Sequence, residues 1–367
     1  MKILHLVRQF YPMIGGLENY VYNLAEQQLK NGHEVSVLTL NRSFVTNEKL
    51  IQYERLDNGL EIHRIPFFFS KKYAITFAAF SHLKNFELLH VHAIDFFTDY
   101  IALTKIFHNK KIILTTHGGF FHTNWAYFLK RIYFHTITRL SLKTYDAVIG
   151  CSDNDIEIFK KIAPGIIKIE NGVNVKPLLN TAKKPDGHTL LYVGRIDIHK
   201  RIDNLIRLIA LLNNQGFEAK LMVVGPDWKH LLPELTHLVN DLEIKEQVTF
   251  TGPVDEKDLV RYYSKAFLFV SASEYEGFGI SAIEALASGT PCVLNDIRSF
   301  RTILKNKPFG ILCNFTNIEE TANAIIEFAN TTKDNYWALS KEARETAKIY
   351  NWESVAREMT KIYELNQ

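Results

Sequence analysis

Apolar and polar positions in the first half of the chain alternate in short blocks that predict a parallel sheet. Several blocks are continuous runs of Val, Ile and Leu, which is typical of strands buried on both faces. The expected strands are 2–7, 34–40, 60–65, 88–92, 112–116, 147–150 and 166–169. A Gly15-Gly16 turn and a helical pattern at 17–30 follow the first strand, and this order begins an α/β unit.

The same kind of pattern restarts after a polar stretch at 180–188, which has no hydrophobic period and the composition of a linker. The expected strands are 189–194, 219–225, 247–251, 267–271 and 291–295, and the expected helices are 202–214, 257–264, 280–288 and 318–329. This alternation predicts a second parallel α/β unit. Since 367 residues also exceed the usual size of one core, we expect two domains, 1–178 and 179–350.

The composition, 47% hydrophobic and 23% charged, is that of an ordinary soluble protein. Three widely spaced cysteines (151, 292 and 313) favour reduced thiols in the cytoplasm over disulfides, and none has metal-site spacing. The longest stretch without a charged residue, 112–129, is too polar to span a membrane. The net charge of +3 divides into +6 for residues 1–180 and −3 for the rest, so the first half is the candidate for facing an anionic surface.

Parallel sheets bind ligands beyond the carboxyl ends of their strands, and two candidate motifs lie there. Gly15-Gly16 precedes a helix, where glycines allow close approach of a phosphate, although a plain tight turn explains the pair as well. Gly194-Arg195 ends a strand, with Lys200 at the next helix. These two cations could neutralise a diphosphate without a metal, or be solvated residues at a helix start.

The most informative segment is 274–289, EYEGFGISAIEALASG. Glu276 precedes a loop whose amides, from Gly277 through Phe278 to Gly279, lie at a helix N-terminus and could bind phosphate or sugar oxygens. Glu284 follows inside the helix, where its two oxygens could accept both hydroxyls of a ribose. Both carboxylates could instead be surface groups, but the two glycines would then be costly without purpose.

His117 follows a strand and precedes two glycines, which would place it at the mouth of a cleft, although a lone histidine is more often structural. His90 and His92 alternate on a strand as metal ligands can. No carboxylate with ligand spacing supports them, so we expect no metal site.

Together, Gly15-Gly16, His117, Gly194-Arg195 with Lys200, and Glu276 with Glu284 resemble the retaining glycosyltransferases of family 4 over the whole chain. The resemblance implies the GT-B fold, in which two Rossmann-like domains face a cleft and a C-terminal helix, here about 352–365, returns to the first domain. It implies that Arg195 and Lys200 bind the donor diphosphate, Glu276 the donor sugar and Glu284 the ribose, with His117 near the sugar. Glu256, in the 251–256 loop, loosely fits a base-reading position.

A narrower likeness is to the family's α-mannosyltransferases of xanthan-type exopolysaccharide assembly, which use GDP-mannose and a polyprenol-diphosphate-linked oligosaccharide. The segments that carry it are 7–10, 14–16, 64–67, 70–71, 90–92, 94–97, 116–123 and 169–173. It implies a nucleotide-sugar donor, a lipid-linked acceptor, no metal cofactor and no nucleic-acid partner. A UDP-sugar donor, or a sugar-nucleotide enzyme such as an epimerase, is the alternative. A dehydrogenase is disfavoured because the loop at 14–19 lacks G-x-G-x-x-G.

Two segments of the first half, 67–80 and 125–134, mix aromatic residues with Lys and Arg. Such a mixture suits the headgroup layer of an anionic membrane, although the aromatic residues could equally belong to the core. The lipid-linked acceptor favours the membrane interpretation. We therefore expect a peripheral protein on the cytoplasmic face of the cell membrane.

Overall fold

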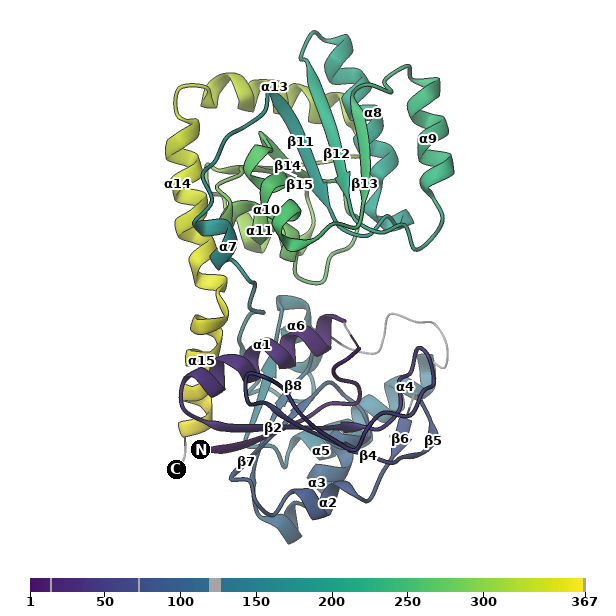
Figure 1. Ribbon diagram of the computed structural model, residues 1–367, viewed down its shortest axis with the longest axis vertical. Helices are drawn as coiled ribbons and strands as arrows, with labels where there is room; N and C mark the ends of the chain where they lie inside the picture. Colours follow the sequence, from purple (N-terminus) through teal and green to yellow (C-terminus); the bar gives the residue numbers. More distant parts are fainter. Residues whose placement is uncertain (14, 72, 119–126, 366–367) are drawn as a thin grey trace. The chain divides into compact units, whose positions relative to one another are not determined.

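The computed structural model describes residues 1–13, 15–71, 73–118 and 127–365, which form two compact units (Figure 1). Unit 1 comprises Met1–Gly172 and Trp352–Gln367, and unit 2 comprises Val173–Asn351. Within the described ranges, no helix has both the length and the apolar character needed to cross a bilayer.

Unit 1 is built on an eight-stranded sheet of order β10-β9-β8-β7-β1-β2-β4-β3, in which only the β3–β4 pair is antiparallel. Its strands are β1 (Lys2–Leu6), β2 (Glu34–Leu40), β3 (Tyr53–Arg55), β4 (Glu61–Ile65), β7 (Leu88–His92), β8 (Lys111–Thr115), β9 (Ala147–Gly150) and β10 (Ile167–Lys168). After β1, the chain first adds strands on one side of it, beginning with β2. It then crosses back and adds strands on the other side, beginning with β7. The pair β1 and β7 is therefore the topological switch point, where such sheets bind ligands.

Helices cover both faces of this sheet, and a small antiparallel hairpin, β5 (Phe68–Ser70) and β6 (Tyr73–Ile75), stands beside them. The helical segments are α1 (Gly16–Lys30), α2 (Ala79–His82), α3 (Phe96–His108), α4 (Tyr127–Tyr133), the π-helical η2 (Phe134–Thr138), α5 (Arg139–Leu142) and α6 (Asp153–Phe159). The last helix of the chain, α15 (Trp352–Glu364), packs against α1 and buries Trp352, Met359 and Tyr363 in the core of unit 1 (Figure 1). The expected return of the C-terminal helix is confirmed.

Unit 2 contains a six-stranded, fully parallel sheet of order β13-β12-β11-β14-β15-β16. The strands are β11 (His188–Val193), β12 (Ala219–Val224), β13 (Val248–Gly252), β14 (Leu268–Ser271), β15 (Cys292–Asn295) and β16 (Gly310–Cys313). The helices are α7 (Lys176–Leu179), η3 (Ile198–Lys200), α8 (Ile202–Asn214), α9 (Leu232–Asp241), α10 (Glu256–Lys265), α11 (Ile280–Ala287), α12 (Arg298–Leu304), α13 (Ile318–Thr332), α14 (Tyr336–Ala347) and η4 (Lys348–Tyr350). This order is that of a Rossmann fold, with its switch point between β11 and β14.

The boundary between the units differs from the expected position at 178/179. Val173, Val175 and Leu178 are buried in the core of unit 2, so this unit begins at Val173. The polar stretch 180–188 is not a linker between domains, because the Lys183 ammonium is buried in unit 2 and bonds the Tyr263 carbonyl and the Thr290 hydroxyl at 2.7 and 2.6 Å. The stretch is polar because it is an irregular segment whose Lys183 side chain is held by hydrogen bonds to groups of unit 2.

Candidate functional site

The candidate donor site lies at the carboxyl edge of the unit 2 sheet, around the switch point between β11 and β14. Three neighbouring strands, β11, β12 and β13, reach glycine at this edge: Gly194, Gly225 and Gly252. A Cβ on Gly225 would lie 2.0 Å from the Gly194 carbonyl oxygen, so the two backbones are in contact and no side chain fits between them. Packing of the two strand ends therefore accounts for Gly225, whereas a Cβ on Gly252 would meet nothing within 4 Å and leaves room for a ligand there.

Lys200 and Glu276 meet at the switch point, each from a loop that follows one of its two strands. The Lys200 ammonium lies 2.5 Å from a Glu276 carboxylate oxygen, and this oxygen also accepts a hydrogen bond from the Ser273 hydroxyl at 3.1 Å. Lys200 is buried, whereas the Glu276 side chain is 19% exposed. A buried cation with an accessible anion beside it can stabilise a phosphate and hold a hydroxyl at adjacent positions.

The two loops are joined by further contacts that hold this pair in place. The Glu274 amide donates to the His199 carbonyl at 2.9 Å, and the Arg201 guanidinium bonds the Glu274 carboxylate at 2.7 Å. On the other side, the Asn295 amide of β15 donates to the Ser273 carbonyl at 3.1 Å. The position of Glu276 is thus determined by contacts with both neighbouring strand ends, as a preorganised site requires.

Arg195 directly follows Gly194 and is exposed, with its guanidinium 4.9 Å from the ring centroid of Trp228. Trp228 lies in the loop after β12 and is 65% exposed. The loop that carries Trp228 is held beside the end of β11, because the Ile196 amide donates a hydrogen bond to the Pro226 carbonyl at 2.9 Å. The cation–π contact holds the guanidinium over the edge of the sheet and leaves its N–H groups available to an anion.

The glycine loop after Glu276 has two different physical explanations. Gly279 adopts φ +91° at the N-cap of α11, and a Cβ there would lie 2.7 Å from Ile303, so packing alone requires a glycine. A Cβ on Gly277 would meet nothing within 4 Å, so the fold itself does not require this glycine. Phe278 packs beside the unit 2 core. The free space at Gly277 is what a ligand at the N-terminus of α11 needs.

Glu284 lies one and a half turns inside α11 and accepts a hydrogen bond from the Tyr263 hydroxyl at 2.8 Å. Burial raises the pKa of its carboxyl to about 7. Glu256, the first residue of α10, is exposed and accepts from the Asn174 amide at 3.1 Å. The structure thus brings Arg195, Lys200, Glu276 and Glu284 to the end of one sheet. Their roles toward a ligand stay predictions.

In unit 1, Gly15 is the extended N-cap of α1 and Gly16 is its first residue. A Cβ on Gly15 would lie 2.3 Å from a Glu18 carboxylate oxygen, so a carboxylate stands at this helix N-terminus. Burial raises the pKa of Glu18. An anionic ligand at α1 would therefore have to displace this side chain, or meet it protonated.

His117 follows β8 with a left-handed backbone of φ +51°, and its ring is engaged at both nitrogens. Nε2 lies 3.1 Å from Nδ1 of His92, and Nδ1 lies 3.6 Å from the Cys151 sulfur. Residues 119–126, which complete the segment singled out in the sequence, lie outside the described residues, as do Ile14 and Lys72. His117 is thus held from inside unit 1.

His5, His90 and His92 form the one cluster in the described residues whose ligand atoms have metal-site spacing. All six of their ring nitrogens already have hydrogen-bond partners within the protein. His5 and His92 are also only 2.8 Å apart, nitrogen to nitrogen, which is shorter than two ligands of one tetrahedral zinc allow at about 2.0–2.1 Å each. The arrangement fits a hydrogen-bonded cluster and does not fit a zinc site.

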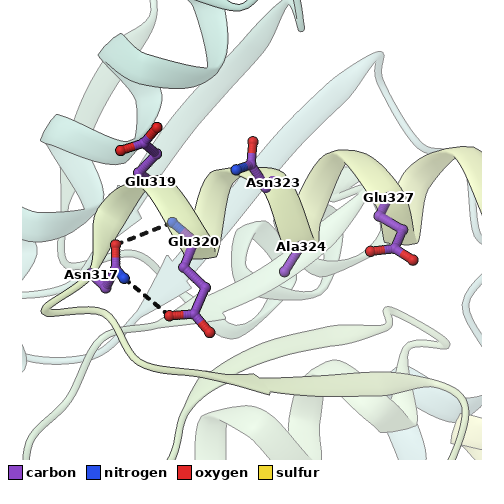
Figure 2. Close-up of a pocket in the computed structure, with 6 residues that line it drawn as sticks. All are labelled: Asn317, Glu319, Glu320, Asn323, Ala324 and Glu327. Atoms are coloured by element: carbon purple, nitrogen blue, oxygen red, sulfur yellow. Dashed lines mark hydrogen bonds between the residues drawn. The ribbon is translucent and has the colours of Figure 1, made fainter.

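Two surface hollows lie away from the strand ends described above. One, of about 510 Å³, follows a face of α13 and carries Glu319, Glu320 and Glu327, with Asn317 capping the helix (Figure 2). Its carboxylates would repel a diphosphate. The other, of about 600 Å³, is lined by Lys2, Glu34 and other residues at the amino ends of the unit 1 strands. Neither has the charge or the position of the donor site.

Several residues at the candidate site were not expected from the sequence. Gly225 and Gly252 each follow an apolar strand and precede proline, and this recurrent strand–Gly–Pro pattern could have indicated this edge of the sheet. Trp228, Ser273 and Asn295 carry no comparable signal, since their position depends on how loops far apart in sequence meet.

Comparison with known proteins finds family matches for both units. Residues 14–176 match the model described as Glycosyltransferase Family 4, and residues 180–349 match the model described as Glycosyl transferases group 1. The GDP-mannose:cellobiosyl-diphosphopolyprenol alpha-mannosyltransferase of Komagataeibacter xylinus is 34% identical over 99% of this chain and 93% of its own length. The enzyme of the same name from Xanthomonas campestris is 33% identical over 97% and 94%. In fold, Anabaena HepE in complex with UDP matches with a TM-score of 0.76 at 15% identity, covering 99% of both chains.

Proposed function

The chain belongs to glycosyltransferase family 4, and from this membership we propose that it transfers mannose from GDP-mannose to an oligosaccharide linked to a polyprenol diphosphate. Its GT-B fold and its activity as a glycosyltransferase follow from the family. The observation that carries the choice of donor and acceptor is the match to two mannosyltransferases over nearly the whole of both chains. That match includes unit 1, which binds the acceptor in this proposal.

The cations of unit 2 support a metal-independent reaction. As the bond between the sugar C1 and the diphosphate oxygen breaks, the electron pair stays on the diphosphate, and Arg195 and Lys200 neutralise the charge. The acceptor hydroxyl forms the new bond to C1 and passes its proton to an oxygen of the departing diphosphate, so that the products are the mannosylated acceptor and GDP. Glu276 holds the sugar hydroxyls as a positioning contact and forms no covalent bond, and Glu284 binds the ribose. We propose retention, so that the α-linked donor gives an α-linked product.

The donor assignment is tested with purified protein and a panel of nucleotide sugars, by measuring release of nucleoside diphosphate. We expect GDP-mannose to be turned over faster than UDP-glucose, UDP-galactose or UDP-N-acetylglucosamine. Activity should persist in EDTA, because Arg195 and Lys200 supply the charge that a divalent ion supplies elsewhere. Preferential turnover of a UDP-sugar would contradict the donor assignment. Loss of activity in EDTA with recovery on adding Mg²⁺ would contradict metal independence.

A lipid-linked acceptor requires the enzyme to reach a membrane, and one face of unit 1 has suitable chemistry. We define the α3–α5 face as the exposed apolar residues of α3, α4, η2 and α5: Leu103, Ile106, Phe107, Phe128, Leu129, Ile132, Ile137 and Leu140, which are 46–82% exposed. Residues 96–143 carry seven Lys and Arg and one acidic residue, Asp99. Large apolar side chains among cations match the interface of an anionic bilayer.

Asp99 explains why these helices form one surface. Its carboxylate accepts hydrogen bonds from the hydroxyls of Tyr73, Tyr133 and Ser141, so that β6, α4 and α5 are all attached to α3. Leu103 and Ile106 follow Asp99 at helical spacing, so the three residues share one side of α3, and both apolar side chains are exposed. Of the two segments expected to face the membrane, 125–134 contributes its described part to this face. Phe68, Phe69 and Phe77 of the other segment are also exposed, at 67–85%.

We expect the protein to sediment with vesicles that contain anionic lipid and to be released as salt rises, because the cations are screened. Ile106→Glu together with Leu129→Glu should weaken this binding at least tenfold without lowering the melting temperature, since both side chains are exposed. Ile51→Glu, at a residue 63% exposed elsewhere on unit 1, is the matched control and should bind as wild type does. Equal sedimentation with neutral and anionic vesicles would refute the proposal.

A further inference from the structure

A chain of buried hydrogen bonds crosses the core of unit 1 from its C-terminal helix to His117. Its members are Tyr363 of α15, Gln28 of α1, His5 of β1, His92 of β7 and His117 after β8. The first four are fully buried. His5 and His90 are register partners on the paired strands β1 and β7, at the switch point of the sheet. The chain therefore passes beneath the carboxyl edge at which this fold binds ligands.

Each step of the chain has hydrogen-bond length. The Gln28 amide nitrogen lies 3.0 Å from the Tyr363 hydroxyl, and the Gln28 oxygen lies 2.7 Å from Nε2 of His5. Nδ1 of His5 lies 2.8 Å from Nε2 of His92, and Nδ1 of His92 lies 3.1 Å from Nε2 of His117.

Two branches complete this series of buried hydrogen bonds. At its outer end, Nδ1 of His117 contacts the Cys151 sulfur at 3.6 Å. At its inner end, the Tyr363 hydroxyl also bonds Nδ1 of His90, whose Nε2 bonds the Thr115 hydroxyl, at 2.6 and 2.7 Å.

These contacts link the tautomers of the histidines. Burial keeps the rings neutral by lowering the pKa of His5 to about 4 and that of His117 to about 3. A neutral imidazole has one donor and one acceptor nitrogen. With the Gln28 oxygen toward His5, Nε2 of His5 must donate, so its Nδ1 accepts from Nε2–H of His92. Nδ1 of His92 then accepts from Nε2–H of His117, whose Nδ1 accepts from the Cys151 thiol.

Reversal of the Gln28 amide reverses the donor and acceptor at every one of these steps. Both arrangements satisfy all the ring nitrogens, whereas a mixed arrangement leaves two donors or two acceptors facing each other in the core. Such a mismatch costs about 1–3 kcal/mol. The tautomer of His117 is therefore coupled to the orientation of an amide three side chains away.

We infer that the C-terminal helix positions His117 through this chain, and that Tyr363, Gln28, His5 and His92 are positioning residues for the transfer reaction. The inference rests on the proposed transfer reaction and on a position of His117 near the transferred sugar, which the family resemblance implies. Because both ring nitrogens of His117 belong to the chain, the orientation of its ring and of its left-handed backbone at φ +51° depends on contacts within the core. Helix α15 thus contributes to the site although Tyr363 is buried beneath it.

The test uses the full-length protein with ¹⁵N-labelled histidine, in which NMR reports the tautomer of each ring. Tyr363→Phe removes the hydroxyl that the Gln28 amide and Nδ1 of His90 share, so it changes the balance between the two orientations of the amide. We expect the ¹⁵N shifts of the two ring nitrogens of His117, assigned with His117→Asn, to change in opposite directions, because the proton population that one nitrogen loses is gained by the other. We also expect kcat to fall about two- to tenfold, as for the loss of one hydrogen bond, with the KM for donor unchanged.

Tyr145→Phe is the matched control, because the Tyr145 hydroxyl is also buried in unit 1 but bonds the Thr98 carbonyl outside the chain. Its His117 signals should stay at their wild-type positions. Gln28→Met, which breaks the same link at a similar volume, should reproduce the shifts of Tyr363→Phe. The inference is overturned if Tyr363→Phe leaves the His117 signals unchanged, or if Tyr145→Phe moves them equally. Full turnover by His117→Asn would instead remove the proposed role of His117 and leave the coupling measurable.

Discussion

Replacement of Lys200 by methionine is expected to lower kcat by about a hundredfold to a thousandfold at saturating donor. Lys200 is buried at the switch point of the unit 2 sheet, 2.5 Å from Glu276, where a leaving diphosphate would develop its charge. Loss of one electrostatic contact to a transition state has this magnitude. Arg195→Ala should act in the same direction. Turnover is measured as release of GDP from GDP-mannose.

The ion pair offers a way to separate a structural role of Lys200 from a role in the reaction. Lys200→Met leaves a partly buried carboxylate unpaired and so should also reduce stability. Adding Glu276→Gln removes that charge and should restore much of the melting temperature while activity remains absent. Recovery of turnover in the double variant would mean that the pair only supports the fold. Lys245→Ala, at an exposed residue of the same unit, should behave as wild type.

Unit 1 is expected to unfold steeply in mild acid, with the free energy of unfolding falling by about 3–4 kcal/mol per pH unit between pH 6 and 4. Burial lowers the pKa of His5 to about 4 and of His117 to about 3, and lowers the pKa of His90 and His92 well below the usual value of 6.5. Through these four rings the unfolded chain binds up to four more protons in this range, and the lowered pKa values of His33, His63 and His108 act in the same sense. Stability is full above pH 6.5 and is lost as the pH falls.

Buried carboxyls reduce this slope. Burial raises the pKa of Asp95 to about 6, so the folded state takes up a proton of its own between pH 6 and 4, and the raised pKa values of Glu18 and Asp155 act in the same sense. The net difference is then two to three protons, which sets the slope given above. Backbone amide hydrogen exchange, recorded at increasing urea concentration at pH 7, 6, 5 and 4.5, measures the free energy of unfolding separately in each unit.

Unit 2 provides the internal comparison, because three of its four histidines, His188, His230 and His237, are exposed. Its amides should stay protected over the pH range in which those of β1, β7 and β8 begin to exchange. A parallel loss of protection in both units would show that the buried histidines do not determine acid stability.

The parallel strands were the part of the fold most open to prediction from sequence. β2, β7 and β9 have the expected bounds, because each is rich in Val, Ile and Leu and is bounded by polar residues or glycine. The helix α8 also matches, since its apolar positions recur at helical spacing. The edge strands β3 and β16 were not expected. β3 has only three residues and no aliphatic side chain, so it carries no strand signal.

The site could be predicted in its chemistry but not in its connections. Strand ends followed by Gly, Arg or Glu pointed to the edge of unit 2 at which the structure gathers these residues, because the topology of a parallel sheet determines where its carboxyl ends meet. The pairing of Lys200 with Glu276 depends on two loops 76 residues apart in sequence. The buried histidine chain likewise joins residues from five separate segments, and no local pattern encodes such contacts.

The return of α15 to unit 1 imposes an order on the synthesis of the protein. The first 172 residues leave the ribosome without Trp352, Met359 and Tyr363, which complete their core. At about 5–20 residues per second, translation of the whole of unit 2 takes roughly 10–35 seconds before those side chains emerge. Through that interval Gln28 and His90 lack the hydroxyl that joins them. We therefore expect the core of the nascent N-terminal unit to stay incomplete until α15 emerges, whereas all of unit 2 has been synthesised by then.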